Sequence, residues 1–298
     1  MINFLLIGDK NYNLQLVNSI NSLANNFDLT VKDSTIYIIH KNPSSFKKYL
    51  KYLKFNKIEI IKFKNEFKVL NNVKNSHLSE VTYYRLYIDK LINLKKGFLI
   101  YFDADLYFLN NSTKYIEESI VELQKTNKTI AAVEEKIITS QNIEYFNKLG
   151  FRNEAYFNAG FIIFNLAKCV EENFFEKLRQ RLSEVNFELK YWDQDILNSV
   201  VNGRFLSLEN KINYGIDLNV DNFLPDDVLA IHYKGKNKPW SIKYAFDLDS
   251  KLYQNLHQSN FFTYHITDLR SNIFKFLKLN IPIKTKIKIL KIQLLKWV

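Results

Sequence analysis

The sequence predicts an α/β fold in which helices flank a mostly parallel central sheet. Short β-branched or aromatic runs alternate with helical patterns along the chain, and this alternation is typical of parallel strands joined by right-handed crossovers. The 298 residues are 47% hydrophobic, which is enough for the core of one large α/β domain. Glycine and proline are scarce, so the composition is neither disordered nor fibrous.

The first part of the sheet follows from three apolar runs. INFLLI at 2–7 predicts the first strand, and the periodic segment at about 14–24 predicts a helix after it. STIYIIH at 34–40 predicts the second strand, with a helix near 44–54. IEIIKF at 58–63 predicts the third strand.

A fourth strand is predicted by GFLIYFDADL at 97–106, after a helix expected at 79–92 that begins at Ser79. This run is continuous enough to be buried on both faces of the sheet. Later strands are expected at 129–133, 160–166, 204–208 and 228–233, and later helices at about 170–185 and 194–202. In such sheets ligands bind outside the carboxyl ends of the strands, where GDKNY at 8–12 and DAD at 103–105 fall.

The net charge of +11 is unevenly distributed along the chain. Residues 270–298 contain eight lysines and arginines and no acidic residue, so residues 1–269 carry only about +3. We therefore expect the basicity to belong to the tail and not to the fold. This distribution disfavours a nucleic-acid binder with a basic face across its domain.

Cysteine content and hydropathy limit the class of protein further. The one cysteine, Cys169, excludes an intramolecular disulfide and a cysteine-based zinc site, and its apolar surroundings favour a packing role. No uncharged apolar run of about 18 residues predicts a membrane-spanning helix. The first residues lack the basic region and cleavage site of a signal peptide, so we expect a cytoplasmic protein.

Two aspartates interrupt the most strand-like run. On a continuing strand, Asp103 and Asp105 would share one face, because successive residues point to opposite faces. Like charges this close repel each other, and a cation between them would remove the difficulty. Carboxylates suit Mg²⁺ or Mn²⁺, and such an ion can bridge the two phosphates of a nucleotide. The alternative is a strand end with one capping and one solvated aspartate.

A third candidate metal ligand lies far downstream. His232 ends a strand-like run, and its imidazole would favour Mn²⁺ somewhat over Mg²⁺. Gly235 would allow a phosphate to approach the backbone closely, and Lys238 supplies positive charge. The alternative is a histidine with a purely structural role at the end of a strand.

Two polar clusters could contact a sugar. NAG at 158–160 precedes an apolar strand, so a ligand could lie against the backbone while Asn158 offers a donor and an acceptor. A plain turn is the alternative there. DQD at 193–195 begins a helix, and an N-cap would explain one of its aspartates. Three consecutive polar side chains exceed what a cap requires and match a site that binds several hydroxyls.

These motifs, in this order, resemble glycosyltransferase family 8, which includes bacterial lipopolysaccharide galactosyl- and glucosyltransferases and glycogenin. The matching segments are GDKNY (8–12), TYYRLYI (82–88), YFDADLYFL (101–109), YFNAGFIIFNL (156–166), WDQDILN (192–198) and HYKGKNKPW (232–240). Lys10 departs from the family pattern, which often has a second acidic residue at this position.

The resemblance implies a GT-A fold, a Rossmann-like nucleotide-binding sheet with the acceptor site beside it. It also implies a retaining, metal-dependent transferase that moves a hexose from UDP-galactose or UDP-glucose. The implied acceptor is a glycan or lipid-linked saccharide, such as lipopolysaccharide, lipooligosaccharide or another surface glycan. The motifs do not distinguish galactose from glucose.

The resemblance further implies roles for the matched residues. Mn²⁺, or Mg²⁺ in its place, would be held by Asp103, Asp105 and His232. The nucleotide would contact Ile7, Asp9, Asn11, Tyr12 (which would stack on the base), Asp103, Ala104, Gly235 and Lys238. The donor sugar would contact Arg85, Asn158, Ala159, Gly160, Asp193 and Gln194.

Gln194 and Asp195 are the catalytic candidates. Retaining hydrolases use a carboxylate nucleophile, whereas the family residue on that side of the sugar is Gln194, whose amide is a poor nucleophile. Asp195 is the nearest carboxylate in the sequence. We expect front-face attack by the acceptor, with electrostatic support from Gln194 and transfer of the acceptor proton to the leaving phosphate.

Composition shifts near residue 260, so we expect a GT-A domain over 1–260 and a basic helical extension over 261–298. The apolar stripe of that extension comprises Ile283, Ile287, Leu290, Leu294 and Trp297. A basic amphipathic helix suits an anionic membrane surface, which here predicts peripheral binding to the inner face of the bacterial cytoplasmic membrane. Packing on the domain or on a second subunit is the alternative.

Two other functions remain open from the sequence. A metal-dependent nucleotidyltransferase would use the same carboxylates and release pyrophosphate instead of UDP, but it gives no obvious purpose to the NAG and DQD clusters. A non-catalytic peripheral membrane adaptor would show no metal-dependent binding of UDP. The intact motifs argue against a site that has lost its activity.

Overall fold

The computed structural model describes residues 2–28, 34–55, 57–64, 80–152, 155–216, 224–235, 237–240, 253, 280 and 282–288. The chain divides into two compact units. The first comprises Met1–Tyr214 and Pro225–His232, and the second comprises Gly215–Leu224 and Tyr233–Val298. The domain boundary expected at residue 260 stays a prediction.

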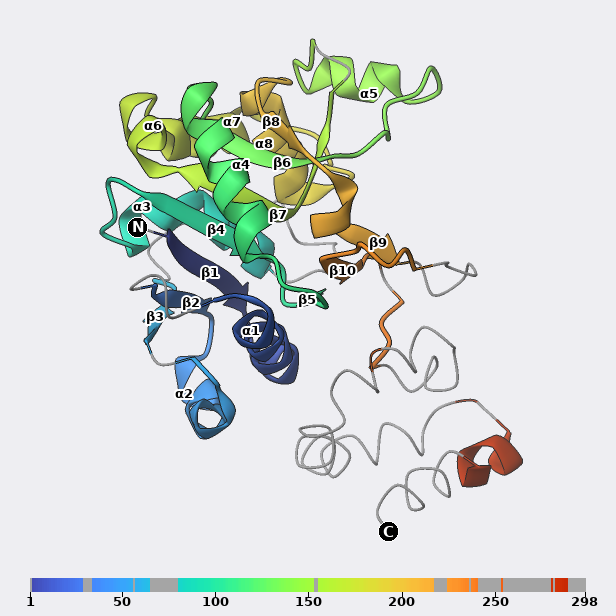
Figure 1. The fold of residues 1–298 in the computed structure, drawn as a ribbon. Helices are drawn as coiled ribbons and strands as arrows, with labels where there is room; N and C mark the ends of the chain where they lie inside the picture. Colours follow the sequence, from blue (N-terminus) through green and yellow to red (C-terminus); the bar gives the residue numbers. More distant parts are fainter. Residues whose placement is uncertain are drawn as a thin grey trace. The chain divides into compact units, whose positions relative to one another are not determined.

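A seven-stranded sheet forms the centre of the first unit (Figure 1). Its strands, in spatial order, are β3 (Ile58–Lys62), β2 (Ile36–His40), β1 (Ile2–Gly8), β4 (Phe98–Phe102), β7 (Phe157–Asn165), β6 (Ile130–Glu134) and β8 (Leu206–Leu208). Within the described residues, β7 runs antiparallel to its neighbours, β4 and β6, and the other strand pairs of this sheet are parallel. The prediction of a mostly parallel sheet is confirmed.

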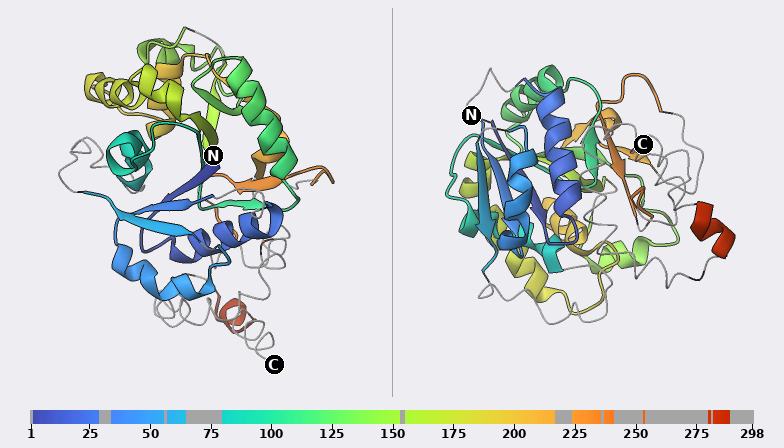
Figure 2. Two further views of the ribbon diagram at one scale, coloured as in Figure 1. Left: turned by 60° about the vertical axis from the view of Figure 1, so that its left-hand side comes forward. Right: turned by 90° about the horizontal axis from the view of Figure 1, so that it is seen from below.

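Helices cover both faces of this sheet (Figure 2). The core on one face joins β1, β4 and β7 to η3 (Glu80–Tyr87), α7 (Phe174–Glu184) and α8 (Trp192–Val201). The helices α1 (Asn13–Asn26) and α4 (Thr113–Lys125) lie over the opposite face. The remaining helices are α2 (Pro43–Phe46), η1 (Lys47–Tyr52), α3 (Ile88–Leu91), α5 (Ile143–Lys148), α6 (Leu166–Glu171) and η4 (Asn210–Ile212).

A second, three-stranded sheet has the order β5 (Leu106–Phe108), β10 (Ala230–Tyr233) and β9 (Tyr214–Ile216). The predicted strand at 97–106 is therefore wrong in its length, because the chain leaves the large sheet after Phe102 and enters the small one at Leu106. The backbone N–H of Leu106 donates to the carbonyl of Asp103 at 3.0 Å, which closes a turn between the two strands.

Other local predictions were incomplete. The helix expected near 44–54 is a short α-helix followed by the 3₁₀ helix η1, and the helix expected at 79–92 is η3 followed by α3, with Ser79 outside the described residues. The helices α4 and α5 were not predicted. Cys169 is buried in the core, as its apolar surroundings suggested, and burial raises the pKa of its thiol.

Of the predicted tail, the structure describes one short helical segment, residues 283–288, in which Ile283 and Ile287 are exposed. Leu290, Leu294 and Trp297 lie outside the described residues. Among the residues that the structure describes, every helix is too short or too polar to cross a bilayer.

Candidate functional site

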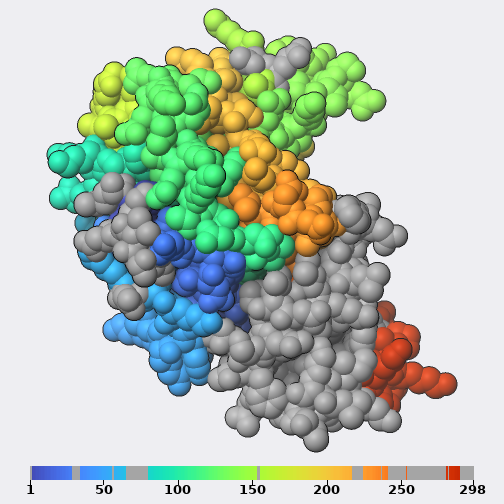
Figure 3. Space-filling model, in the orientation of Figure 1, coloured from blue at the N-terminus to red at the C-terminus, as the bar shows by residue number. Residues whose placement is uncertain are grey.

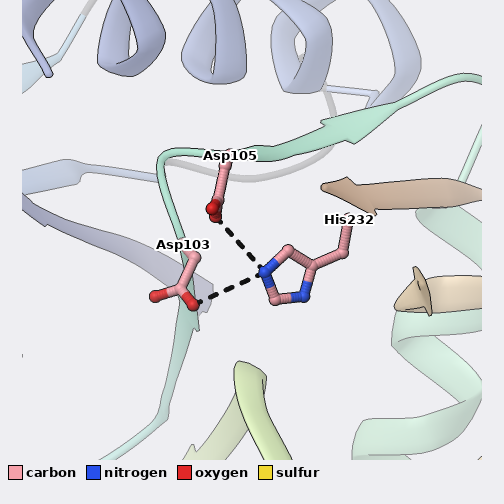
Figure 4. Close-up of side chains that lie close together, drawn as sticks. All are labelled: Asp103, Asp105 and His232. Atoms are coloured by element: carbon pink, nitrogen blue, oxygen red, sulfur yellow. Dashed lines mark ion pairs between the residues drawn. The ribbon is translucent and has the colours of Figure 1, made fainter. Parts of the chain in front are cut away.

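The turn after β4 and the strand β10 bring together Asp103, Asp105 and His232 (Figure 4). β10 pairs antiparallel with β5, and this register places His232 opposite Leu106. The Nε2 atom of His232 lies 3.3 Å from Asp105 Oδ1 and 3.8 Å from Asp103 Oδ2. One potential ligand atom from each side chain lies within 4.8 Å of the others. The aspartates therefore meet the histidine from a turn, and not from the face of a continuing strand.

A chain of side-chain amides orients the His232 ring. The Oδ1 atom of Asn158 accepts the backbone N–H of Gly160 at 2.9 Å, which fixes that amide. The Nδ2 group of Asn213 donates to the same oxygen at 2.9 Å, so Asn213 Oδ1 faces His232 Nδ1, 2.8 Å away. With Nδ1 hydrogen-bonded to Asn213, the ring directs Nε2 at the two carboxylates, where this atom could also bind a metal ion.

Gly160 provides the space for this ring. A Cβ atom at this position would lie 2.6 Å from His232 Nδ1 and would also overlap Cε1. Because these atoms belong to a ring held by Asn213, a substituted residue 160 would have to displace it. The predicted contact between Gly160 and a donor sugar stays a prediction, and the structure adds this second requirement for glycine.

The donor set fits a hard divalent cation. Two carboxylates and one neutral imidazole are ligands that Mn²⁺ accepts readily. The side chain of Asp103 is 29% exposed, whereas those of Asp105 and His232 are 13% and 7% exposed. The two carboxylates repel each other, and a cation between them and Nε2 would replace this repulsion with coordination.

Arg85 connects this trio to the DQD helix. The Arg85 guanidinium is buried, and its Nε atom lies 2.7 Å from Asp193 Oδ2. Its Nη1 group donates to the carbonyl of Ala159 at 2.7 Å. Its Nη2 is 3.4 Å from Asp103 Oδ1, and the group lies 4.2 Å from the centroid of the Tyr101 ring. The Tyr101 hydroxyl donates to the same carboxyl oxygen of Asp103. Arg85 thus holds the metal-site turn, β7 and α8 in one geometry.

Asp193 is buried beside this guanidinium. Burial raises the pKa of its carboxyl to about 7, while the Arg85 charge acts in the opposite direction. With Arg85 at 2.7 Å, the carboxylate and the guanidinium form a buried pair, and the contacts of Arg85 with Ala159 and Asp103 help to compensate its desolvation. Removing either partner would leave an uncompensated charge.

Gln194 lies against the backbone of the NAG segment. Its Oε1 atom accepts the N–H of Ala159 at 2.9 Å, and its Nε2 group is 3.4 Å from Glu135 Oε2. The same oxygen of Glu135 accepts from Asn158 Nδ2 at 3.1 Å. The structure therefore brings the predicted sugar-binding residues Asn158, Ala159 and Gln194 together at the carboxyl end of β6.

Asp195 has a different environment. It is completely buried, and it accepts hydrogen bonds from the hydroxyls of Tyr145 and Tyr156 and from the backbone N–H of Tyr191. The Tyr156 bond is 2.8 Å long, and the N–H of Lys190 in turn donates to the Tyr145 hydroxyl at 2.8 Å. Burial raises the pKa of Asp195, and these donors oppose that rise. This arrangement favours a positioning role over attack on a substrate.

The predicted nucleotide-binding loop lies beside the trio. The Asp9 carboxylate accepts the N–H of Asn11 at 2.8 Å, and its carbonyl accepts the N–H of Tyr12 at 3.1 Å, so the loop folds tightly before α1. Burial raises the pKa of the Tyr12 hydroxyl, and the nearby carboxylates of Asp105, Asp103 and Asp9 raise it further.

Two more nucleotide-contact predictions fall within this unit. Ile7 is buried near the carboxyl end of β1, and Ala104 is buried in the turn between the aspartates. Their burial leaves mainly backbone atoms for a ligand to contact.

Gly235 and Lys238 belong to the second unit, and their contacts with a nucleotide stay predictions. Gly235 has a φ of +73°, a conformation that favours glycine. The Lys238 ammonium donates to the carbonyl of Tyr233 at 2.6 Å and lies 5.9 Å from the centroid of the Trp240 ring.

Sequence reasoning missed two polar residues of the site. Glu135 follows β6 directly, so a carboxylate at the end of a predicted strand was the signal that could have identified it, as it identified Asp103. Asn213 carries no such signal, because its contact with His232 depends on chain segments that meet only in the fold.

Comparisons with known proteins agree with this geometry. The model of glycosyl transferase family 8 matches residues 3–243. The lipopolysaccharide 1,3-galactosyltransferase of Salmonella typhimurium is 27% identical over 173 residues, which cover 53% of this chain and 49% of that protein. The lipopolysaccharide 1,2-glucosyltransferase of Escherichia coli K12 is 26% identical over 226 residues, 72% of this chain and 64% of that protein. Most of the curated relatives are matched over only about half of their length.

A solved structure shares the fold. The crystal structure of the galactosyltransferase LgtC, in complex with donor and acceptor sugar analogues, matches with a TM-score of 0.68 and 20% sequence identity. The match covers 87% of this chain and 96% of that one, so the architecture is the GT-A fold of LgtC. Since the family model extends over more than half of the sequence, the chain belongs to glycosyl transferase family 8.

Proposed function

We propose that this chain is a metal-dependent, retaining hexosyltransferase that moves galactose or glucose from a UDP-sugar to a saccharide acceptor. The observation that carries the proposal is the convergence of Asp103, Asp105 and the Nε2 atom of His232. The lipopolysaccharide galactosyl- and glucosyltransferases among the relatives support an acceptor of the lipopolysaccharide or lipooligosaccharide type.

The residues of the trio would hold Mn²⁺, or Mg²⁺ in its place. When bound, such an ion supplies positive charge that stabilises a leaving diphosphate. Asp9, Asn11 and Tyr12 would hold the nucleoside, next to the trio. Arg85, fixed by Asp193, would keep the turn of Asp103 in place while the phosphate departs.

We propose front-face attack by the acceptor. The acceptor oxygen forms a bond to the anomeric carbon on the side from which the phosphate oxygen departs. The acceptor proton passes to that phosphate oxygen, so the products are a glycoside with retained configuration and UDP. The side-chain carbonyl of Gln194 already accepts the N–H of Ala159, and Asp195 already accepts hydrogen bonds from two tyrosine hydroxyls. These contacts support front-face attack over a nucleophile supplied by the protein.

Release of UDP is the direct test. Purified protein with Mn²⁺ is incubated with UDP-galactose, UDP-glucose and other UDP-sugars, with and without candidate acceptors. We expect acceptor-dependent release of UDP from one hexose donor, abolished by EDTA and restored by Mn²⁺. Release of pyrophosphate from a nucleoside triphosphate would support a nucleotidyltransferase instead. If the protein shows no metal-dependent binding of UDP, that result would support a non-catalytic adaptor.

We also propose that residues 270–298 bind the inner face of the bacterial cytoplasmic membrane. Their eight basic residues without an acidic one, and the apolar stripe predicted within 283–298, support this role. Deletion of residues 270–298 should lower the share of the protein that sediments with membranes at moderate salt while sparing activity on a soluble acceptor. Unchanged membrane association after the deletion would contradict the role of the tail.

A further inference from the structure

A second basic segment lies in the first unit, far from the tail in sequence. Residues 41–64 contain eight lysines and one glutamate, a net charge of +7. Residues 1–269 together carry about +3, so subtracting this segment leaves about −4 for the rest of them. The expectation that the basicity belongs to the tail and not to the fold is therefore wrong for this segment. The net positive charge of the fold is concentrated in 24 consecutive residues.

The segment displays its charge on the surface. It forms α2, η1 and the edge strand β3, and all eight of its lysines are exposed: Lys41, Lys47, Lys48, Lys51, Lys54, Lys57, Lys62 and Lys64. We call this the α2–β3 lysine surface. In Figure 3 the light-blue region that contains it forms a continuous face beside α1.

Apolar and aromatic groups lie among these charges. The side chain of Leu50 is 39% exposed. The ammonium groups of Lys48 and Lys51 lie 5.0 Å and 4.9 Å from the ring centroids of Tyr49 and Tyr52, and both rings are partly exposed. Lysines with an apolar residue and tyrosines between them are the composition of a surface that lies on a bilayer interface.

The surface is held firmly to the fold. The amide of Asn21 on α1 donates to the carbonyl of Tyr52 and accepts the N–H of Lys54, both at 2.9 Å. The buried ring of Phe46 lies 5.7 Å from the ring of His40 at the end of β2. The lysines therefore project from a fixed platform, and little backbone ordering is needed when they meet a partner.

We propose that the α2–β3 lysine surface docks on an anionic membrane, independently of the tail. Charge complementarity supports a partner rich in phosphate, because the segment has a net charge of +7 and all eight of its lysines are exposed. The segment contains no arginine, the residue that suits bidentate recognition of phosphate in nucleic acids or phosphopeptides. Lysine point charges suit the diffuse potential of a lipid surface.

The test uses the full chain and two variants of equal net charge. In the first, Lys47, Lys48 and Lys51 are changed to glutamine. In the matched control, the exposed lysines Lys95, Lys96 and Lys148 are changed to glutamine. Each protein is sedimented with vesicles of phosphatidylglycerol and phosphatidylcholine, and with vesicles of phosphatidylcholine alone. Equal melting temperatures show that both variants keep the fold.

We expect the first variant to lower the partition coefficient on anionic vesicles by on the order of a hundredfold, because each lysine near such a surface contributes about fivefold. The control variant should stay close to the parent protein, and salt should weaken binding of the parent. Equal partitioning of the two variants would overturn the proposal, whatever the enzymatic activity. So would lysine-dependent binding of a labelled single-stranded RNA without binding to vesicles.

Discussion

Asp103/Asp105 and Asp193/Asp195 are both pairs of aspartates with one residue between their members, and the fold treats these two pairs in opposite ways. Asp103 and Asp105 lie in a turn between two sheets and are partly exposed, and the Nε2 atom of His232 is directed at them. Asp193 and Asp195 begin α8 and are buried, the first beside Arg85 and the second among donors from Tyr145, Tyr156 and Tyr191.

The difference shows how to distinguish a binding carboxylate from a structural one. In the buried pair, the protein itself supplies a counter-charge to Asp193 and hydrogen-bond donors to Asp195. This pair therefore stabilises one geometry. The pair in the turn is partly exposed and lies next to His232 Nε2, so a divalent cation could bind to all three side chains. The motif alone does not separate these cases, because both pairs consist of the same residues at the same spacing.

The largest expected effect is that of Asp105→Asn. The substitution removes one anionic ligand, so we expect acceptor-dependent UDP release to fall by at least about a thousandfold and the Mn²⁺ dissociation constant to rise by roughly a hundredfold. The melting temperature should change by less than about 2 °C, since the substitution also removes a like charge from the turn. Calorimetric titration measures the Mn²⁺ dissociation constant, and a UDP-release assay measures the activity. Unchanged Mn²⁺ affinity would remove the distinction between the two pairs.

Asp195→Asn should have the converse profile. The amide would present an N–H₂ group to one of the three donors around it, and we expect the free energy of unfolding to fall by about 2–4 kcal/mol in urea titrations. The affinity for Mn²⁺ should stay within about threefold of the parent value. If turnover fell by a thousandfold while stability were kept, Asp195 would be a catalytic nucleophile and the comparison would fail.

Asn213→Leu tests the amide chain behind the metal site. Loss of the acceptor for His232 Nδ1 should raise the Mn²⁺ dissociation constant by about 10- to 100-fold, because groups that orient a metal-binding histidine contribute on that scale. Asn147→Leu, on the exposed face of α5, is the matched control and should leave the affinity unchanged. Equal affinities in both variants would contradict the role of Asn213 in orienting His232.

The smallest effect is expected for Tyr145→Phe. The variant removes one hydroxyl donor from Asp195 and leaves the other two, so the free energy of unfolding should fall by about 1–2 kcal/mol. Tyr49→Phe, at a partly exposed position of the α2–β3 lysine surface, serves as the control in the same urea titrations. A loss as small as that of the control would mean that the Tyr145 hydroxyl contributes little to holding Asp195.

Much of the sheet could be predicted, because buried parallel strands are continuous apolar runs, and β1, β2 and β3 fall within one or two residues of the expected ranges. The end of β4 could not be predicted, because the apolar residues continue beyond Asp105 into β5, which belongs to another sheet. The amphipathic pattern of α4 was available in the sequence and was overlooked. A 3₁₀ helix such as η3 has no distinct periodicity over so few turns.

The site was predicted less evenly. Asp103, Asp105 and His232 could be named as one set because the family resemblance links motifs that are distant in sequence, and the structure brings them together. The network of Glu135, Asn158 and Asn213 could not be derived, because hydrogen bonds between amides depend on the register of β7 and on the path of the chain before β9. The burial of Asp195 followed from tyrosines on α5 and before β7, which no local pattern connects to α8.

The turn at Asp103–Leu106 also has a consequence for how the protein is made. The ligands come from residues 103 and 232, so a ribosome must synthesise more than a hundred further residues after the aspartates before β10 can pair with β5. A cation that binds all three side chains could therefore take no part in the pairing of β1 with β4, and it would stabilise the chain only after β10 has paired with β5. At a concentration one hundred times its dissociation constant, it would add about 2.7 kcal/mol to the stability of the folded state.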